Sequence, residues 1–280
     1  MSGYRFCRTD DIGLLVDALN RCWAPHFPDE PLMTAAAFKR SIRDLQVWCS
    51  SCMVAFAGAD PIGVLIGAKR PSGTLVHRIA VHPDHCRQGH GRHLLTSLSS
   101  KLAILGPPRI LAEVPDSFAP ACRLFSASGY VDEAALTDYV LSHQRPQAGG
   151  IPGTFMIPVT VDDLAANGLL GASDVRCWER SVETLMARKD EIAGLAVASD
   201  ERIEAFVLHL PDGEIVAINS LVEDAGARLQ ALLSRLPAGG PATWRLTRVH
   251  PAETAPELLE SLGFRAASHY RLYATTARAA

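Results

Sequence analysis

The segment HRIAVHPDHCRQGHGRHLL, residues 77–95, concentrates residues that could do chemistry. Its histidines and its cysteine are metal-ligand types, whereas its arginines and glycines are typical of a loop that wraps a phosphate. A metal site needs ligands that converge with tetrahedral geometry, and these histidines flank a proline turn without a second ligand cluster. The sequence therefore favours the phosphate loop and predicts no metal site. A glycine-containing turn that binds nothing is the other alternative.

A strand and a helix would position this loop. Residues 73–83 are predicted to form a strand that ends at Pro83. After the loop, leucines repeat at helical spacing: Leu94, Leu95, Leu98, Leu102 and Leu105. The first amides of a helix lack internal partners and carry partial positive charge. Because glycine lets a phosphate approach these amides, and arginines stand beside them, the loop is predicted to hold a pyrophosphate.

The composition is that of a soluble globular protein. Of the residues, 48% are hydrophobic and 20% are charged. The chain has 280 residues, which is long enough for two domains. The chain begins with charged residues and has no run of eighteen apolar ones, so we expect neither secretion nor a membrane partner. Seven cysteines without an export signal indicate reduced thiols in a cytoplasm. Few lysines and many alanines are typical of a GC-rich bacterial genome.

The charge distribution favours the first half as the cofactor-binding half. The net charge of −3 is too small to indicate a nucleic-acid partner. Residues 1–150 carry a balance of +2, whereas residues 151–280 carry −5. A polyanionic cofactor would therefore bind more favourably to the first half.

A segment rich in Pro, Gly and polar residues, SHQRPQAGGIPG, divides the chain. We predict an N-terminal domain at residues 1–143, a linker at 144–153 and a C-terminal domain at 154–280. The same order of elements, β-β-β-α-β-α-β, occurs on both sides and indicates a tandem duplication. The fold class is predicted to be mixed α/β (α+β), with two domains that each hold a mostly antiparallel twisted sheet flanked by helices.

The segment LVHRIAVHPDHCRQGHGRHLL resembles the acetyl-CoA signature of the GNAT superfamily of N-acetyltransferases. That signature is Q/R-x-x-G-x-G/A after a long strand ending in V-x-P, and its positions fall on Cys86, Gly89 and Gly91. YRFCRTDDIGLLVDALN resembles the superfamily's first strand and helix, and APACRLFSASGY resembles its late helix. The resemblance thus extends through most of residues 4–142. In the second half, LLESLGFRAASHYRLY resembles the same fold.

The resemblance implies a tandem GNAT protein with a degenerate second domain. It would transfer an acetyl group from acetyl-CoA to the amine of a small molecule or peptide. Backbone groups of Ile79, Ala80 and Val81 would pair with the pantetheine arm, and the acetyl carbonyl would lie between HRIAV and ILAEV. The residues implied at the pyrophosphate are Cys86, Arg87, Gln88, Gly89, His90, Gly91 and Arg92. Both a monomer and a homodimer are compatible with the sequence.

Three positions depart from the superfamily pattern. Cys86 replaces the first Gln or Arg, Leu75 replaces a frequent strand carboxylate, and Phe125 replaces a frequent tyrosine acid. They motivate an alternative function, a non-catalytic acyl-CoA-binding or regulatory module. His77 would face the same side as Leu75 in a regular strand, so it is the candidate catalytic base. A hydrogen-bonded structural histidine is the competing interpretation.

Two further segments carry expectations. Asp29 and Glu30, in the proline- and aromatic-containing loop 22–31, could hold a cationic amine. In the C-terminal domain, the equivalent of the phosphate loop is EDAGA, residues 223–227. Two carboxylates there oppose a pyrophosphate, so we expect this domain not to bind acetyl-CoA.

Overall fold

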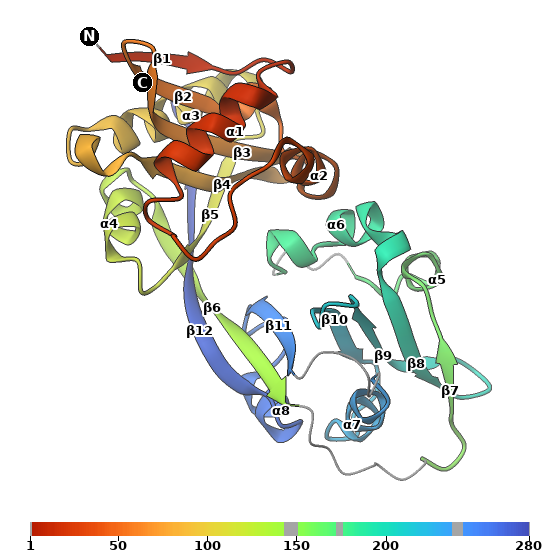
Figure 1. Cartoon of the computed structure of the whole chain (residues 1–280). Coiled ribbons are helices and arrows are strands. Elements are labelled where there is room, and N and C mark those ends of the chain that lie inside the picture. Colours follow the sequence, from red (N-terminus) through yellow and green to blue (C-terminus); the bar gives the residue numbers. More distant parts are fainter. Residues whose placement is uncertain (1, 143–150, 172–175, 237–242, 280) are drawn as a thin grey trace. The chain divides into compact units, whose positions relative to one another are not determined.

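The computed structural model of the chain describes residues 2–142, 151–171, 176–236 and 243–279 (Figure 1). The chain divides into two compact units: residues 1–134 together with 271–280 form unit 1, and residues 135–270 form unit 2. Both are mixed sheets flanked by helices, as the sequence predicts. Within the described residues, no helix is long and apolar enough to cross a membrane.

Unit 1 is built on a twisted sheet with helices on both faces (Figure 1). In sheet order its strands are β1 (Ser2–Phe6), β2 (Met53–Ala57), β3 (Asp60–Arg70), β4 (Gly73–Val81), β5 (Arg109–Pro115) and the end of β12 (Arg265–Thr276). The helices are α1 (Ile12–Cys22), α2 (Ala35–Leu45), α3 (His90–Leu105) and α4 (Ala119–Ala127). Strands β1 to β4 are antiparallel neighbours, and β4 and β5 are parallel.

The apolar stripe of α3 packs against this sheet. Its buried members are Leu94, Leu95, Leu98 and Leu102, and they join one core cluster with residues of β2 to β5. Leu105, predicted to belong to the stripe, ends the helix with 63% of its surface exposed. Burying the other four leucines fixes α3, and therefore the loop before it, to the sheet.

Unit 2 contains a sheet of four antiparallel strands, in the order β10-β9-β8-β7. Their bounds are β7 (Phe155–Pro158), β8 (Ala193–Ala198), β9 (Ile203–His209) and β10 (Ile215–Ser220). The other strands are β11 (Thr243–Val249), β6 (Val131–Ser142) and the first half of β12. The helices are α5 (Val161–Ala166), α6 (Val182–Ala187), α7 (Ala227–Ser234) and α8 (Pro256–Ser261).

The last strand of each sequence repeat lies beside the fifth strand of the other repeat. In the sheet order β12 follows β5, whereas β6 pairs antiparallel with β11. The end of β12 is fixed in unit 1 by Arg271, which pairs with Asp116 at 2.6 Å and with Asp132 at 2.7 Å. The two compact units therefore differ from the predicted domains, residues 1–143 and 154–280. The predicted domain bounds stay a prediction. Most of the predicted linker, residues 144–150, lies outside the described residues.

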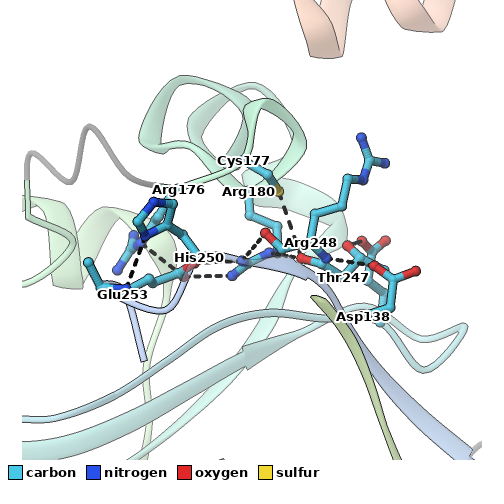
Figure 2. A network of polar contacts seen from close by, with 10 residues as sticks. Asp138, Arg176, Cys177, Arg180, Thr247, Arg248, His250 and Glu253 are labelled. Atoms are coloured by element: carbon cyan, nitrogen blue, oxygen red, sulfur yellow. Dashed lines mark hydrogen bonds and ion pairs between the residues drawn. The ribbon is translucent and has the colours of Figure 1, made fainter. Parts of the chain in front are cut away.

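A buried ion pair holds the edge of β11 in unit 2 (Figure 2). The Arg180 side chain is 0% exposed and makes bonds of 2.7 and 2.6 Å to the two carboxylate oxygens of Glu253. Its Nε donates to the Thr247 carbonyl at 2.6 Å, and its Nη2 donates to the Arg248 carbonyl at 3.3 Å. Arg180 thus satisfies β11 carbonyls with its own side chain.

Arg180→Ala should lower the free energy of unfolding by about 3 kcal/mol, because Glu253 would lose its two short bonds and keep only the 3.5 Å pair with Arg176, while two β11 carbonyls would lose their donor. Thermal and denaturant unfolding followed by circular dichroism would measure the change. The control is Lys189→Ala, which removes a partly exposed pair with Asp162 (2.7 Å) and should leave stability near that of the wild type. An Arg180→Ala protein as stable as this control would contradict the prediction.

Candidate functional site

Strands β4 and β5 separate after a short stretch of pairing. Thr74 pairs with Ile110 and Leu75 pairs with Leu111. Both strands continue beyond these residues, to Val81 and to Pro115, but no further pair joins them in the described part of the chain. Strand β4 also has a bulge on the side that faces β3. Arg78 pairs with Ile66 and Val76 pairs with Gly67, so His77 is an extra residue between two consecutive residues of β3. A bulge bends its strand and increases the local twist. The two strands therefore enclose a split that widens toward their C-terminal ends.

The open edge of β4 presents two of the three predicted backbone positions to the split. The His82 amide donates to the Ile62 carbonyl of β3 at 2.9 Å. Because backbone groups alternate along an antiparallel strand, those of Ala80 also point to β3, whereas those of Ile79 and Val81 point into the split. We infer that Ile79 and Val81 can bond a ligand strand and that Ala80 serves the β3–β4 ladder.

The N-terminus of α3 leaves its amides unpaired at the wide end of the split. Gly89 is the N-cap, with a φ of 87°, and Arg87 is also left-handed, with a φ of 59°. The first intrahelical bond runs from the His93 amide to the Gly89 carbonyl at 3.0 Å. Within the described part of the chain, the amides of residues 87–92 donate to no acceptor, and neither Arg87 nor Arg92 has an ion-pair partner. Free amides and free cations make this loop a candidate anion cradle, which is the name used for it below.

The two glycines of the loop have different roles. A Cβ on Gly89 would meet no atom within 4 Å, so its positive φ is what favours glycine there. A Cβ on Gly91 would lie 3.0 Å from a methyl group of Leu124, so Gly91 lets α3 and α4 approach each other. The Cys86 amide donates to the Pro83 carbonyl at 3.2 Å. The Cys86 amide is therefore already bonded, whereas the amides predicted to hold the pyrophosphate, those of residues 87–92, follow it; the role of Cys86 stays a prediction.

The histidines of the segment are bonded to their neighbours. Tyr4 Oη lies 2.6 Å from His90 Nδ1, and the Tyr4 ring packs on His93 with 3.8 Å between centroids. The Asp84 amide donates to His82 Nδ1 at 3.3 Å. In the part of the chain that the structure describes, no group of three or more His, Cys, Asp or Glu could hold a metal ion.

His77 is the extra residue of the β4 bulge and is half-buried. The expectation of a regular strand from Leu75 to His77 was therefore wrong, because the bulge interrupts the alternation of side chains. Leu75 is buried, and Phe125 is buried against the rings of Tyr130 and Tyr273. Burial raises the pKa of the Tyr130 phenol, which keeps it protonated. The positions of the superfamily's frequent carboxylate and phenol are core positions here.

Arg78 and His26 also lie at the split, and the sequence alone did not suggest either of them as a site residue. Arg78 lies 4.6 Å from the ring centre of Trp23, and its Nη1 bonds Glu30 Oε2 at 3.1 Å. The Trp23 indole donates to the same oxygen at 3.0 Å. Glu30 is thus neutralised by Arg78 and is not a free anion for an amine, contrary to the expectation from its position. The signal that could have suggested Arg78 was a cation inside an otherwise apolar strand.

Unit 2 has an equivalent helix start, but its own carboxylate fills it. Gly226 is the N-cap of α7 with a φ of 85°, matching Gly89. The Asp224 carboxylate accepts the Gly226 amide at 3.0 Å and the Arg228 amide at 2.9 Å. Arg228 in turn pairs with Asp224 at 2.9 Å and with Glu204 at 2.6 Å. Hydrogen bonds to the charged form and the nearby guanidinium lower the pKa of Asp224 despite some burial, so it stays ionised.

Comparisons with known proteins agree with this geometry. Residues 14–130 match the acetyltransferase (GNAT) family. A GCN5-related N-acetyltransferase from Sphaerobacter thermophilus has 16% identity and a TM-score of 0.71 over 99% of this chain and 96% of its own. A tandem GNAT protein from the clavulanic acid biosynthesis pathway has 16% identity and a TM-score of 0.65 over 99% of both chains. No curated protein sequence matches the chain significantly.

The matched residues include β4, the cradle and α3, which are the elements that define the split. The TM-scores show that the two solved structures share the fold of the whole chain, and at 16% identity they show the fold alone. Residues 14–130 are therefore similar to the acetyltransferase (GNAT) family, and the likeness over the whole length of the chain is one of fold.

The full chain should bind one molecule of acetyl-CoA, because the α7 amides in unit 2 are occupied by Asp224. Isothermal titration calorimetry of the whole protein would give the stoichiometry. Two equivalents, or loss of binding in Asp224→Ala with the cradle of unit 1 intact, would contradict this prediction.

Proposed function

We propose that the chain transfers an acetyl group from acetyl-CoA to the amine of a small molecule or peptide. The observation that carries the proposal is the free α3 N-terminus at the wide end of the β4–β5 split. The amides of residues 87–92 and the guanidiniums of Arg87 and Arg92 would hold the pyrophosphate. The backbone edge at Ile79 and Val81 would pair with the pantetheine amides as an added strand does.

The reaction needs an amine nucleophile and the removal of one proton. The neutral amine attacks the thioester carbonyl carbon, a C–N bond forms, and the C–S bond breaks with the pair leaving on sulfur. The ammonium proton must reach a base, and the thiolate gains a proton afterwards. His77, at the bulge where the split begins, is the candidate base, directly or through a water.

Gly89→Glu should abolish measurable acetyl-CoA binding, because it puts an anion where the pyrophosphate would contact the cradle. Gly58→Glu is the matched control: Gly58 is exposed, has a φ of 62°, and has no atom within 4 Å of an added Cβ. Both variants carry similar backbone strain and the same new charge. Calorimetric affinity in folded Gly89→Glu equal to that of Gly58→Glu would refute the assigned cradle.

A non-catalytic acyl-CoA-binding module is the alternative, since Leu75 and Phe125 stand at core positions. Coenzyme A release, followed with a thiol reagent across a panel of amines, separates the two functions. With the amine so identified, His77→Ala should lower kcat/KM by about 10²-fold or more while acetyl-CoA affinity stays unchanged. A fully active His77→Ala protein would make His77 structural, and no release with any amine would favour the alternative.

A further inference from the structure

Residues 23–30, between α1 and α2, bridge the wide end of the β4–β5 split. His26 Nε2 lies 2.8 Å from the carbonyl oxygen of Val81, the last residue of β4. On the other side, Phe27 packs edge-on against Phe118, with 5.4 Å between ring centroids. Phe118 lies three residues after Pro115, the last residue of β5, and its amide donates to the Pro115 carbonyl at 3.0 Å. Adjacent side chains of this segment therefore contact both walls of the split.

The segment is also braced internally. Trp23 stacks on Phe27 with 4.4 Å between centroids, and its indole donates to Glu30 at 3.0 Å. Arg78 of β4 pairs with the same Glu30 carboxylate at 3.1 Å. These contacts close the segment on itself and hold it to β4 at a second point.

The Val81 carbonyl has no acceptor capacity left for a ligand. A carbonyl oxygen has two lone pairs, and here one partner is His26 and the other is the Cys86 thiol at 3.5 Å. Its direction places this oxygen in the split, where a pantetheine amide would pair with it. An incoming amide must therefore displace a side chain, and the thiol is the weaker of the two donors.

We propose that residues 23–30 are a latch on the acyl-donor channel, closed in the free chain by the His26–Val81 bond and opened when the donor takes over that carbonyl. The proposal rests on the proposed function, because it needs a donor in the split. His26 is a positioning residue here, and no chemical step passes through it. The latch lowers the apparent donor affinity by the fraction of chains that are open.

Removing the imidazole should therefore strengthen donor binding. A net hydrogen bond of ordinary strength corresponds to a change in affinity of about two- to tenfold. His26→Ala should bind acetyl-CoA tighter by that factor, with most of the gain in the association rate, because closed chains no longer delay entry. His26→Gln, whose amide can still donate to Val81, should bind with nearly wild-type affinity.

Calorimetry and stopped-flow binding of acetyl-CoA to the full chain test the latch. The matched control is His269→Ala, which removes an exposed histidine of unit 2 and should leave affinity unchanged. Unchanged or weaker binding in His26→Ala would overturn the latch, and so would equal tightening by His26→Ala and His26→Gln. If the wild type binds no acetyl-CoA while folded, the proposed function fails instead, so the two failures are distinguishable.

Discussion

The pairing between β4 and β5 is the constraint on which the rest of the site depends. Parallel neighbours in a sheet normally continue their ladder, but these strands pair at two successive positions and then separate. The bulge in β4 at His77 bends the strand at the point of separation. Two features of unit 1 depend on that opening: the β4 edge at Ile79 and Val81, which does not pair with β5, and the α3 amides at the wide end of the split.

The two units differ in what bonds to the unpaired amides at the start of a helix. Each has a helix that starts with a left-handed glycine, Gly89 or Gly226, and each helix start concentrates unpaired amides. In unit 2 the Asp224 carboxylate accepts hydrogen bonds from those amides, and the Arg180 guanidinium donates to carbonyls of β11. Among the described residues, no carboxylate accepts from the α3 amides of unit 1. Two repeats of one fold can therefore differ in whether the amides at a helix start are left open or are bonded by a side chain of the same repeat.

Local features were predictable from the sequence. The leucine stripe, the loop glycines and the flanking arginines are within one helix and the turn before it, so their spacing was sufficient to predict α3, and the anion cradle at its start stays a prediction. Features that depend on a partner strand were not predictable. The bulge at His77 is defined by its register with β3, and the exchange of β6 and β12 is defined by pairing between repeats. Glu30 was predicted as a free anion because Arg78, its partner, is distant in sequence.

A crystal structure of the full chain grown with acetyl-CoA would show where the donor binds. We expect the pyrophosphate to contact amides between Arg87 and Arg92, and the pantetheine arm to lie along Ile79 and Val81 in the β4–β5 split. Electron density for the donor at the start of α7, with Asp224 displaced, or outside the split of unit 1, would contradict this expectation.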